Sequence, residues 1–146
     1  MSTPQNFKNH TRFYPPFHFV LMPILVLNFI FSVYDTLHRY PEHKYLFHWW
    51  IVMSIALILL ALLGRRQALT AQDRIIRLEE RLRLATLLPA SEHMHINEFT
   101  TRQLIALRFA SDAELPDLAR RTLTQNLEPK AIKQAIVNWR ADNLRV

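Results

Sequence analysis

Histidine is the residue type in this chain best suited to hold a metal ion or a haem, and the histidines of interest fall into two groups. His38, His43 and His48 surround a short connector between two apolar stretches, and His93 and His95 flank a methionine later in the chain. Neither group has the spacing of ligands on one helix face or a carboxylate placed as a clear co-ligand. We therefore predict no cofactor, although a single histidine of the first group would suffice to ligate a metal, a pigment or a haem shared with a neighbouring subunit.

Other reaction centres lack the residues that they need. The 146 residues include no cysteine, which excludes disulfides, iron–sulfur clusters, thiol nucleophiles and thiolate zinc sites. The single glycine excludes the dinucleotide-binding and P-loop signatures, each of which needs two or more. No Ser/His/Asp set or pair of carboxylates has a usable spacing. We expect a protein that is not an enzyme.

Two apolar stretches, residues 17–37 and 45–63, dominate the first half of the chain. Each has the roughly 20 residues that a helix needs to cross ~30 Å of hydrocarbon. A buried apolar hairpin of a soluble protein is the alternative, but the chain offers no comparable second surface to cover it. The two stretches therefore predict a transmembrane hairpin over residues 17–63.

The orientation of this hairpin follows from the basic residues near its ends, because positive charge accumulates on the cytoplasmic side. The connector carries Arg39 and Lys44. More basic residues lie beyond the outer ends of the two stretches: Lys8, Arg12, Arg65, Arg66, Arg74 and Arg77. We predict that both termini are cytoplasmic and that Arg65 and Arg66 contact anionic lipid headgroups.

Two residues of the first stretch are unusual for a transmembrane helix. Pro23 cannot donate a backbone hydrogen bond and predicts a kink. Asn28 lies near the middle, where an amide without a partner is costly. An interhelical hydrogen bond that fixes the helix register is one interpretation of Asn28, and binding of an ion or a pigment is the other.

A stripe of apolar and small residues continues from the second stretch into the polar half of the chain. At alternating steps of three and four it comprises Ser54, Leu57, Ala61, Gly64, Ala68, Ala71, Ile75, Leu78, Leu82 and Ala85. We call this stripe the seam. Its heptad-like spacing on one continuous helix, which Pro89 ends, predicts a stalk over residues 64–88 that packs on another helix. The partner is either a copy of this chain or another subunit, or the seam docks elements of its own chain.

Charged pairs are expected to support the same helix. Asp73 with Arg77 and Glu79 with Arg83 have the i,i+4 spacing of helix-surface ion pairs.

Residues 89–146 predict a small module of three short helices after a polar break at residues 90–97. The first helix covers residues 99–109, and the second is opened either by a capping box from Ser111 to Glu114 or nearer Leu115. The third begins at Pro129, and its apolar residues at helical spacing, the last of which is Trp139, are expected to face the interior of the module. A module of this size cannot make a large core alone, so we expect it to fold back on residues 67–88.

Basic charge in this half does not indicate nucleic-acid binding. The basic cluster that follows the second apolar stretch is already explained by the predicted cytoplasmic side of the membrane, where positive charge accumulates. The remaining basic residues are mixed with acids and accompany no aromatic platform.

The C-terminal part of the chain resembles a known family. The runs RQLIALRFASDAELP (residues 102–116) and KAIKQAIVNWR (residues 130–140) are similar to an uncharacterised family of small bacterial two-span membrane proteins. The resemblance extends from the second span to the C-terminus. It implies a location in the bacterial cytoplasmic membrane and supplies no activity.

Together these observations predict an all-α membrane protein with four parts. They are an N-terminal tail (residues 1–16), a transmembrane hairpin (17–63), a helical stalk (64–88) and a cytosolic helical module (89–146). The function that we expect is that of a non-catalytic accessory subunit of a larger membrane complex, for which a respiratory or photosynthetic complex would be a natural host. A self-associating scaffold and a histidine-dependent metal- or haem-binding component are the alternatives.

Overall fold

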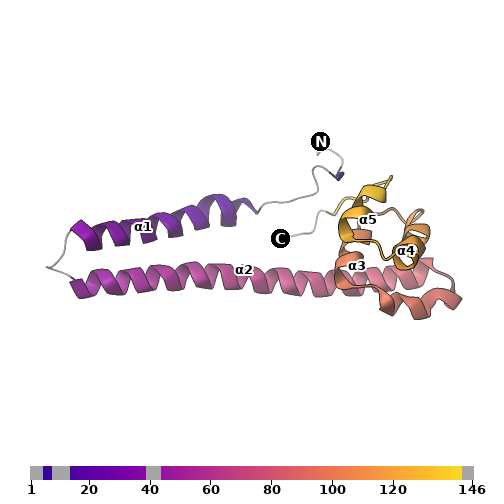
Figure 1. Ribbon diagram of the computed structural model, residues 1–146, viewed down its shortest axis with the longest axis horizontal. Helices are drawn as coiled ribbons and strands as arrows, with labels where there is room; N and C mark the ends of the chain where they lie inside the picture. The colour runs from indigo at the N-terminus through magenta and orange to yellow at the C-terminus, as the bar shows by residue number, and fades with distance from the viewer. Residues whose placement is uncertain (1–4, 8–13, 39–43, 143–146) are drawn as a thin grey trace. The chain divides into compact units, whose positions relative to one another are not determined.

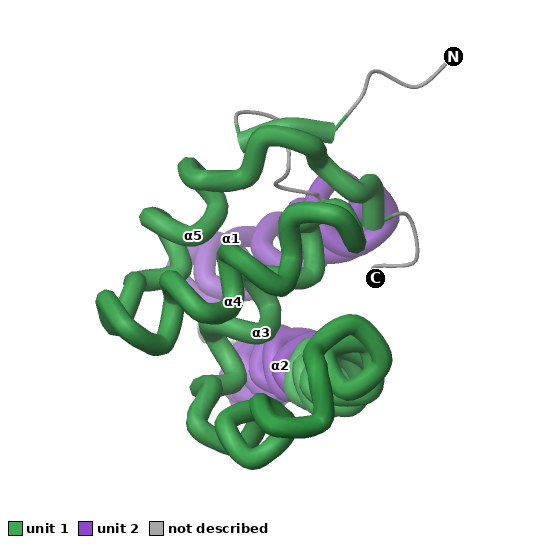
Figure 2. The backbone as a smooth tube through the Cα atoms, turned by 90° about the vertical axis from the view of Figure 1, so that its right-hand side faces the viewer, with its two compact units in different colours: residues 1–12, 69–146 green, residues 13–68 purple. Residues whose placement is uncertain are grey.

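The computed structural model describes residues 5–7, 14–38 and 44–142, and within these ranges every regular element is helical (Figure 1). In chain order the elements are η1 (Pro16–Leu21), α1 (Met22–His38), α2 (Lys44–Leu87), η2 (Ala90–Glu98), α3 (Thr101–Leu107), α4 (Leu115–Thr124) and α5 (Pro129–Ala135). The chain divides into two compact units (Figure 2). One comprises residues 1–12 and 69–146, and the other comprises residues 13–68. The all-α class is confirmed.

A π-helical segment precedes α1. In η1 the backbone hydrogen bonds reach one residue further than in an α-helix, as between the Met22 N–H and the Phe17 carbonyl. The segment ends two residues before Pro23, which cannot donate a hydrogen bond to the Phe19 carbonyl and would crowd it in a regular α-turn. The distortion that we expected at this proline therefore takes the form of a wide helical turn on its N-terminal side.

Helix α2 is continuous over 44 residues. At about 1.5 Å per residue it is roughly 65 Å long, as the absence of proline from residues 44–88 predicts. It ends at Leu87, two residues before Pro89. Continuity of the helix past residue 63 is confirmed.

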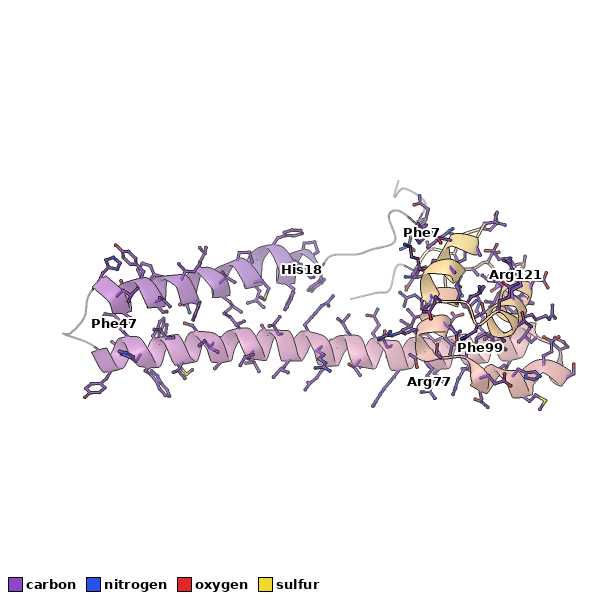
Figure 3. The ribbon with its side chains drawn as sticks, viewed as in Figure 1. Phe7, His18, Phe47, Arg77, Phe99 and Arg121 are labelled. Atoms are coloured by element: carbon purple, nitrogen blue, oxygen red, sulfur yellow. The ribbon has the colours of Figure 1, made fainter. Side chains whose placement is uncertain are left out.

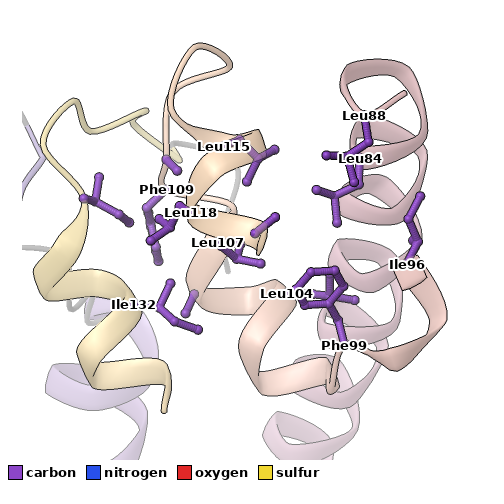
Figure 4. Packing of buried hydrophobic residues seen from close by; sticks show 14 residues of the cluster. Leu84, Leu88, Ile96, Phe99, Leu104, Leu107, Phe109, Leu115, Leu118 and Ile132 are labelled. Carbon is purple, nitrogen blue, oxygen red and sulfur yellow. The ribbon is translucent and has the colours of Figure 1, made fainter. Parts of the chain in front are cut away.

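The hydrophobic core lies in the unit that contains residues 69–146. Leu84 of α2 and Leu88, which directly follows α2, belong to the same buried cluster as Leu104, Leu115 and Ile132 of α3, α4 and α5 (Figure 4). Leu84, Leu104, Leu115 and Ile132 are completely buried. The three short helices thus use the end of α2 as part of their core, as expected for a module too small to bury enough apolar surface alone.

Two helix starts in the module differ from the sequence prediction. A complete capping box opens α3, in which Thr100 and Gln103 cap each other's backbone N–H groups. The predicted capping box at Ser111 is wrong, because α4 starts at Leu115 and its N-cap residue Glu114 makes no side-chain cap. The alternative start near Leu115 is confirmed.

Glu114 instead forms hydrogen bonds with the segment that follows α5. Its carboxylate accepts hydrogen bonds from the backbone N–H groups of Ser111, Val137 and Asn138, at 3.1–3.3 Å. An acid whose spacing suggests a helix cap therefore joins two segments that lie more than 20 residues apart.

Two further segments of the module add detail to the sequence prediction. The polar break after α2 forms the 3₁₀ helix η2 over residues 90–98. The third helix begins at Pro129 as predicted but ends at Ala135, so Trp139 is not on its inward face. Trp139 instead forms an isolated antiparallel bridge with Ala110 and packs on the Phe109 ring at 5.2 Å between centroids.

Candidate interaction surface

A cluster of polar side chains joins α1 to the first part of α2. Asn28 donates to the Ser54 hydroxyl at 2.7 Å and accepts from the Trp50 indole at 3.2 Å. The Ser32 and Ser54 hydroxyls are 3.2 Å apart, and both residues are almost completely buried. The predicted interhelical hydrogen bond of Asn28 is confirmed. Because the amide is satisfied by α2, the cluster sets the register of the two helices.

Arg65 is held beside the start of η1. Its guanidinium carbon lies 5.9 Å from the ring centroid of Tyr14 and 5.8 Å from that of Phe17, within the range of cation–π attraction. Arg66 is exposed. These contacts leave the predicted role of Arg65 and Arg66 at lipid headgroups untested.

Side chains project from several sides of α1 and of the first part of α2 (Figure 3), and many of the large apolar ones are exposed. Only 6% of the most apolar 18 residues is buried in Pro16–His38, which joins η1 and α1, and likewise in Tyr45–Leu87 of α2. Large exposed residues include Phe19, Leu27, Phe31, Leu37, Trp49 and Leu60. Both of these segments are long and apolar enough to cross a membrane. A core helix of a soluble domain would instead be mostly buried.

The described residues cover the seam in part, and Leu57 near its start is already 41% exposed. Ser54 is 1% exposed in the polar cluster, and Ala61 and Ala85 are half-buried. Between them, Gly64, Ala68 and Ala71 are exposed. No described atom lies within 4 Å of the position that a Gly64 Cβ would take, apart from neighbouring backbone.

The large aliphatic residues of the seam are also exposed. Ile75, Leu78 and Leu82 are 58%, 61% and 61% exposed. Among the described parts of the chain, no helix covers these three side chains, so docking of the seam on its own chain, one of the three predicted arrangements, is not seen for this stretch.

The C-terminal module occupies a different face of α2. Ile76, Glu80, Leu84 and Leu88 are the buried residues of this stretch, at regular steps of four. Their spacing in the sequence was a usable signal for the docking face, although the acid within it obscured the pattern.

Arg83 links this face of α2 to the loop between α3 and α4. It contacts the Glu80 carboxylate at 3.2 Å and the Asp112 carboxylate at 2.6 Å, and donates to the Ala110 carbonyl. The partner that we predicted for Arg83, Glu79, is therefore replaced by Glu80 and Asp112, because the arginine turns toward the module.

Burial raises the pKa of Glu80 above its ordinary value, and the positive charges of Arg83, Arg140 and Arg108 oppose this shift. Sequence reasoning did not single out this carboxyl group.

The structure separates the histidines rather than gathering them. His38 donates to the Tyr34 carbonyl at 2.9 Å and stacks on the Tyr34 ring, while His48 is exposed on α2. His43 lies outside the described residues. His93 contacts the Leu88 carbonyl, and His95 pairs with Glu98 at 2.7 Å. Within the described ranges no group of three or more His, Asp or Glu side chains could hold a metal ion.

A cavity of about 440 Å³ lies between η2 and α4. Its lining is Leu88, Glu92, His95, Glu98, Phe99, Ala119, Arg120, Leu123 and Thr124. Arg120 binds both Glu92 oxygens, at 2.9 and 3.0 Å, and this carboxylate raises the pKa of the guanidinium. The charges at this cavity are thus largely neutralised by each other.

The model of one protein family matches residues 1–146, which is the whole chain. The chain belongs to the DUF6526 family, a family of unknown function. The match confirms membership of an uncharacterised family and extends further than the C-terminal resemblance seen in the sequence. No curated protein and no solved structure matches the chain.

Proposed function

We propose that this DUF6526 protein is a small, non-catalytic subunit of a larger assembly in the bacterial cytoplasmic membrane. In this proposal α1 and the first part of α2 form a transmembrane hairpin, and the rest of α2 is a stalk that carries the helical module in the cytosol. The observation that carries it is the outward exposure of the large apolar side chains on both long helices. Exposure of a side chain of this size to water is unfavourable by about 1.5–3 kcal/mol of free energy relative to burial. Contact with the hydrocarbon of a bilayer avoids this loss.

The role of a subunit is supported by an exposed surface on the part of α2 that follows its apolar stretch. Ile75, Leu78 and Leu82 expose an aliphatic stripe on a part of α2 that also carries many charges. Contiguous apolar surface on a polar segment is typical of a protein-binding site.

Purification of the tagged full chain from membranes in a mild detergent tests this proposal. We expect the protein to elute in a particle much larger than the 17.3 kDa chain, together with other membrane proteins that mass spectrometry can identify. Elution of the chain alone, or with copies of itself only, would contradict the role of a subunit.

A further inference from the structure

The exposed stretch of the seam has the residue pattern of a two-stranded parallel coiled coil. In a heptad written abcdefg, Ile75 and Leu82 take position a and Leu78 takes position d. Ile75 at a followed by Leu78 at d is the combination that favours two parallel strands, whereas Leu82 at the next a position is not β-branched. All three side chains are about 60% exposed, so their own chain does not fill the positions facing them.

The module leaves this side of α2 free. In the same heptads, Ile76, Glu80 and Leu84 fall at positions b, f and c, which form the outer face of a coiled coil. The structure buries these outer positions, with Leu84 in the module core, and exposes the a and d positions from Ile75 to Leu82. The next d position, Ala85, is half-buried against the module core, so the open part of the seam ends at Leu82. A second α2 can therefore pack on the seam without displacing the module.

Charges beside the seam fit a second copy in parallel orientation. Arg74 is at position g and Glu79 is at position e of the next heptad, and both are exposed. Residues g and e, five positions apart, lie opposite each other across a parallel two-stranded interface. The symmetry of a dimer makes each pair occur twice, with Arg74 of one copy beside Glu79 of the other.

We infer that two copies of this chain pair in parallel through α2, around Ile75, Leu78 and Leu82, with reciprocal ion pairs between Arg74 and Glu79. This inference rests on the proposed membrane hairpin, which fixes α2 in one orientation and excludes antiparallel pairing. Confinement to one bilayer also raises the effective concentration of the partner, which offsets the shortness of the seam.

Disulfide crosslinking of the full chain in membranes tests the inference, because the natural sequence has no cysteine. In a parallel in-register pair, the side chains of one d position approach within disulfide distance. Oxidation should therefore crosslink Leu78→Cys at least several-fold more than Arg77→Cys, a control at the neighbouring exposed outer position. Equal crosslinking of the two variants, or crosslinking of Leu78→Cys to a different protein, would overturn the inference.

Charge reversal tests the ion pairs in the same assay. Arg74→Glu in the Leu78→Cys background places like charges across the interface and should reduce crosslinking several-fold, and adding Glu79→Arg should restore it. Failure of the double reversal to restore crosslinking would overturn the reciprocal pairing. Carbonate washing of the same membranes separates the two proposals: release of the protein contradicts the membrane hairpin, whereas retention without crosslinking contradicts the dimer alone.

Discussion

At the scale of single residues, Glu80 shows how one carboxyl group can couple stability to pH. Among the described residues it is the buried side chain that carries an ionisable acid, at 5% exposure. Desolvation by the surrounding core outweighs the attraction of Arg83 and raises its pKa. The folded state therefore favours the protonated carboxyl group more than the unfolded chain does.

The sign of the resulting pH dependence follows from linkage. Because the folded-state pKa is the higher one, the stabilising contribution of Glu80 is present below the unfolded pKa and is lost as pH rises through the folded pKa. Glu80→Gln mimics the protonated form. We expect the variant and the natural protein to have similar free energies of unfolding near pH 4, and the variant to be the more stable at neutral pH.

Denaturant unfolding of the module, followed by tryptophan fluorescence at several pH values, measures this difference. Asp112→Asn is the matched control, since Asp112 also contacts Arg83 but its side chain is 70% exposed. A difference between Glu80→Gln and the natural protein that does not change with pH would contradict the expectation.

At the scale of elements, two faces of α2 have different surroundings, one buried in the module core and the other exposed. Leu84 is completely buried in the module core, whereas Leu82, two residues earlier on the same helix, is 61% exposed. Two residues of separation turn a side chain by about 200° around a helix, so neighbouring leucines reach opposite surroundings.

The two leucines give a matched test of this division. Leu84→Ala removes buried methyl groups and leaves a cavity, and should lower the free energy of unfolding of the module by about 2–5 kcal/mol. Leu82→Ala should change the stability of the module by no more than about 0.5 kcal/mol. Protection of module backbone amides against hydrogen exchange in the full chain reports both values. Comparable losses in the two variants would show that the module is not packed on the Leu84 face.

At the scale of the whole molecule, the proposed membrane topology makes opposite predictions for the start of α2 and for the segment that follows α5. Tyr45 and Val137 are both 80% exposed, so differences in their reactivity would reflect compartment rather than burial. In intact cells a membrane-impermeant maleimide should label Tyr45→Cys, at the predicted outer end of α2. It should label Val137→Cys only after the membrane is opened, because in the proposed topology the basic cluster beyond residue 64 places that side in the cytoplasm.

Labelling yields in intact and permeabilised cells measure this directly, with the cysteine-free natural chain as blank. Labelling of both variants in intact cells, or protection of both, would contradict a hairpin with cytoplasmic termini.

Features that depend on neighbours along the chain follow from the sequence without the fold. Apolar runs and the absence of proline from residues 44–88 were enough to predict a helix that continues past residue 63, and Pro129 marked the start of α5. Tertiary structure alone decided which face of α2 meets the module, that Arg83 turns to Asp112, and that Glu114 binds the segment after α5 instead of capping α4. These choices depend on residues that are distant in sequence, and their energies arise only when the segments meet. Helical periodicity in the sequence therefore predicted the apolar faces of α2. Packing against the module decided which face is buried and which stays exposed.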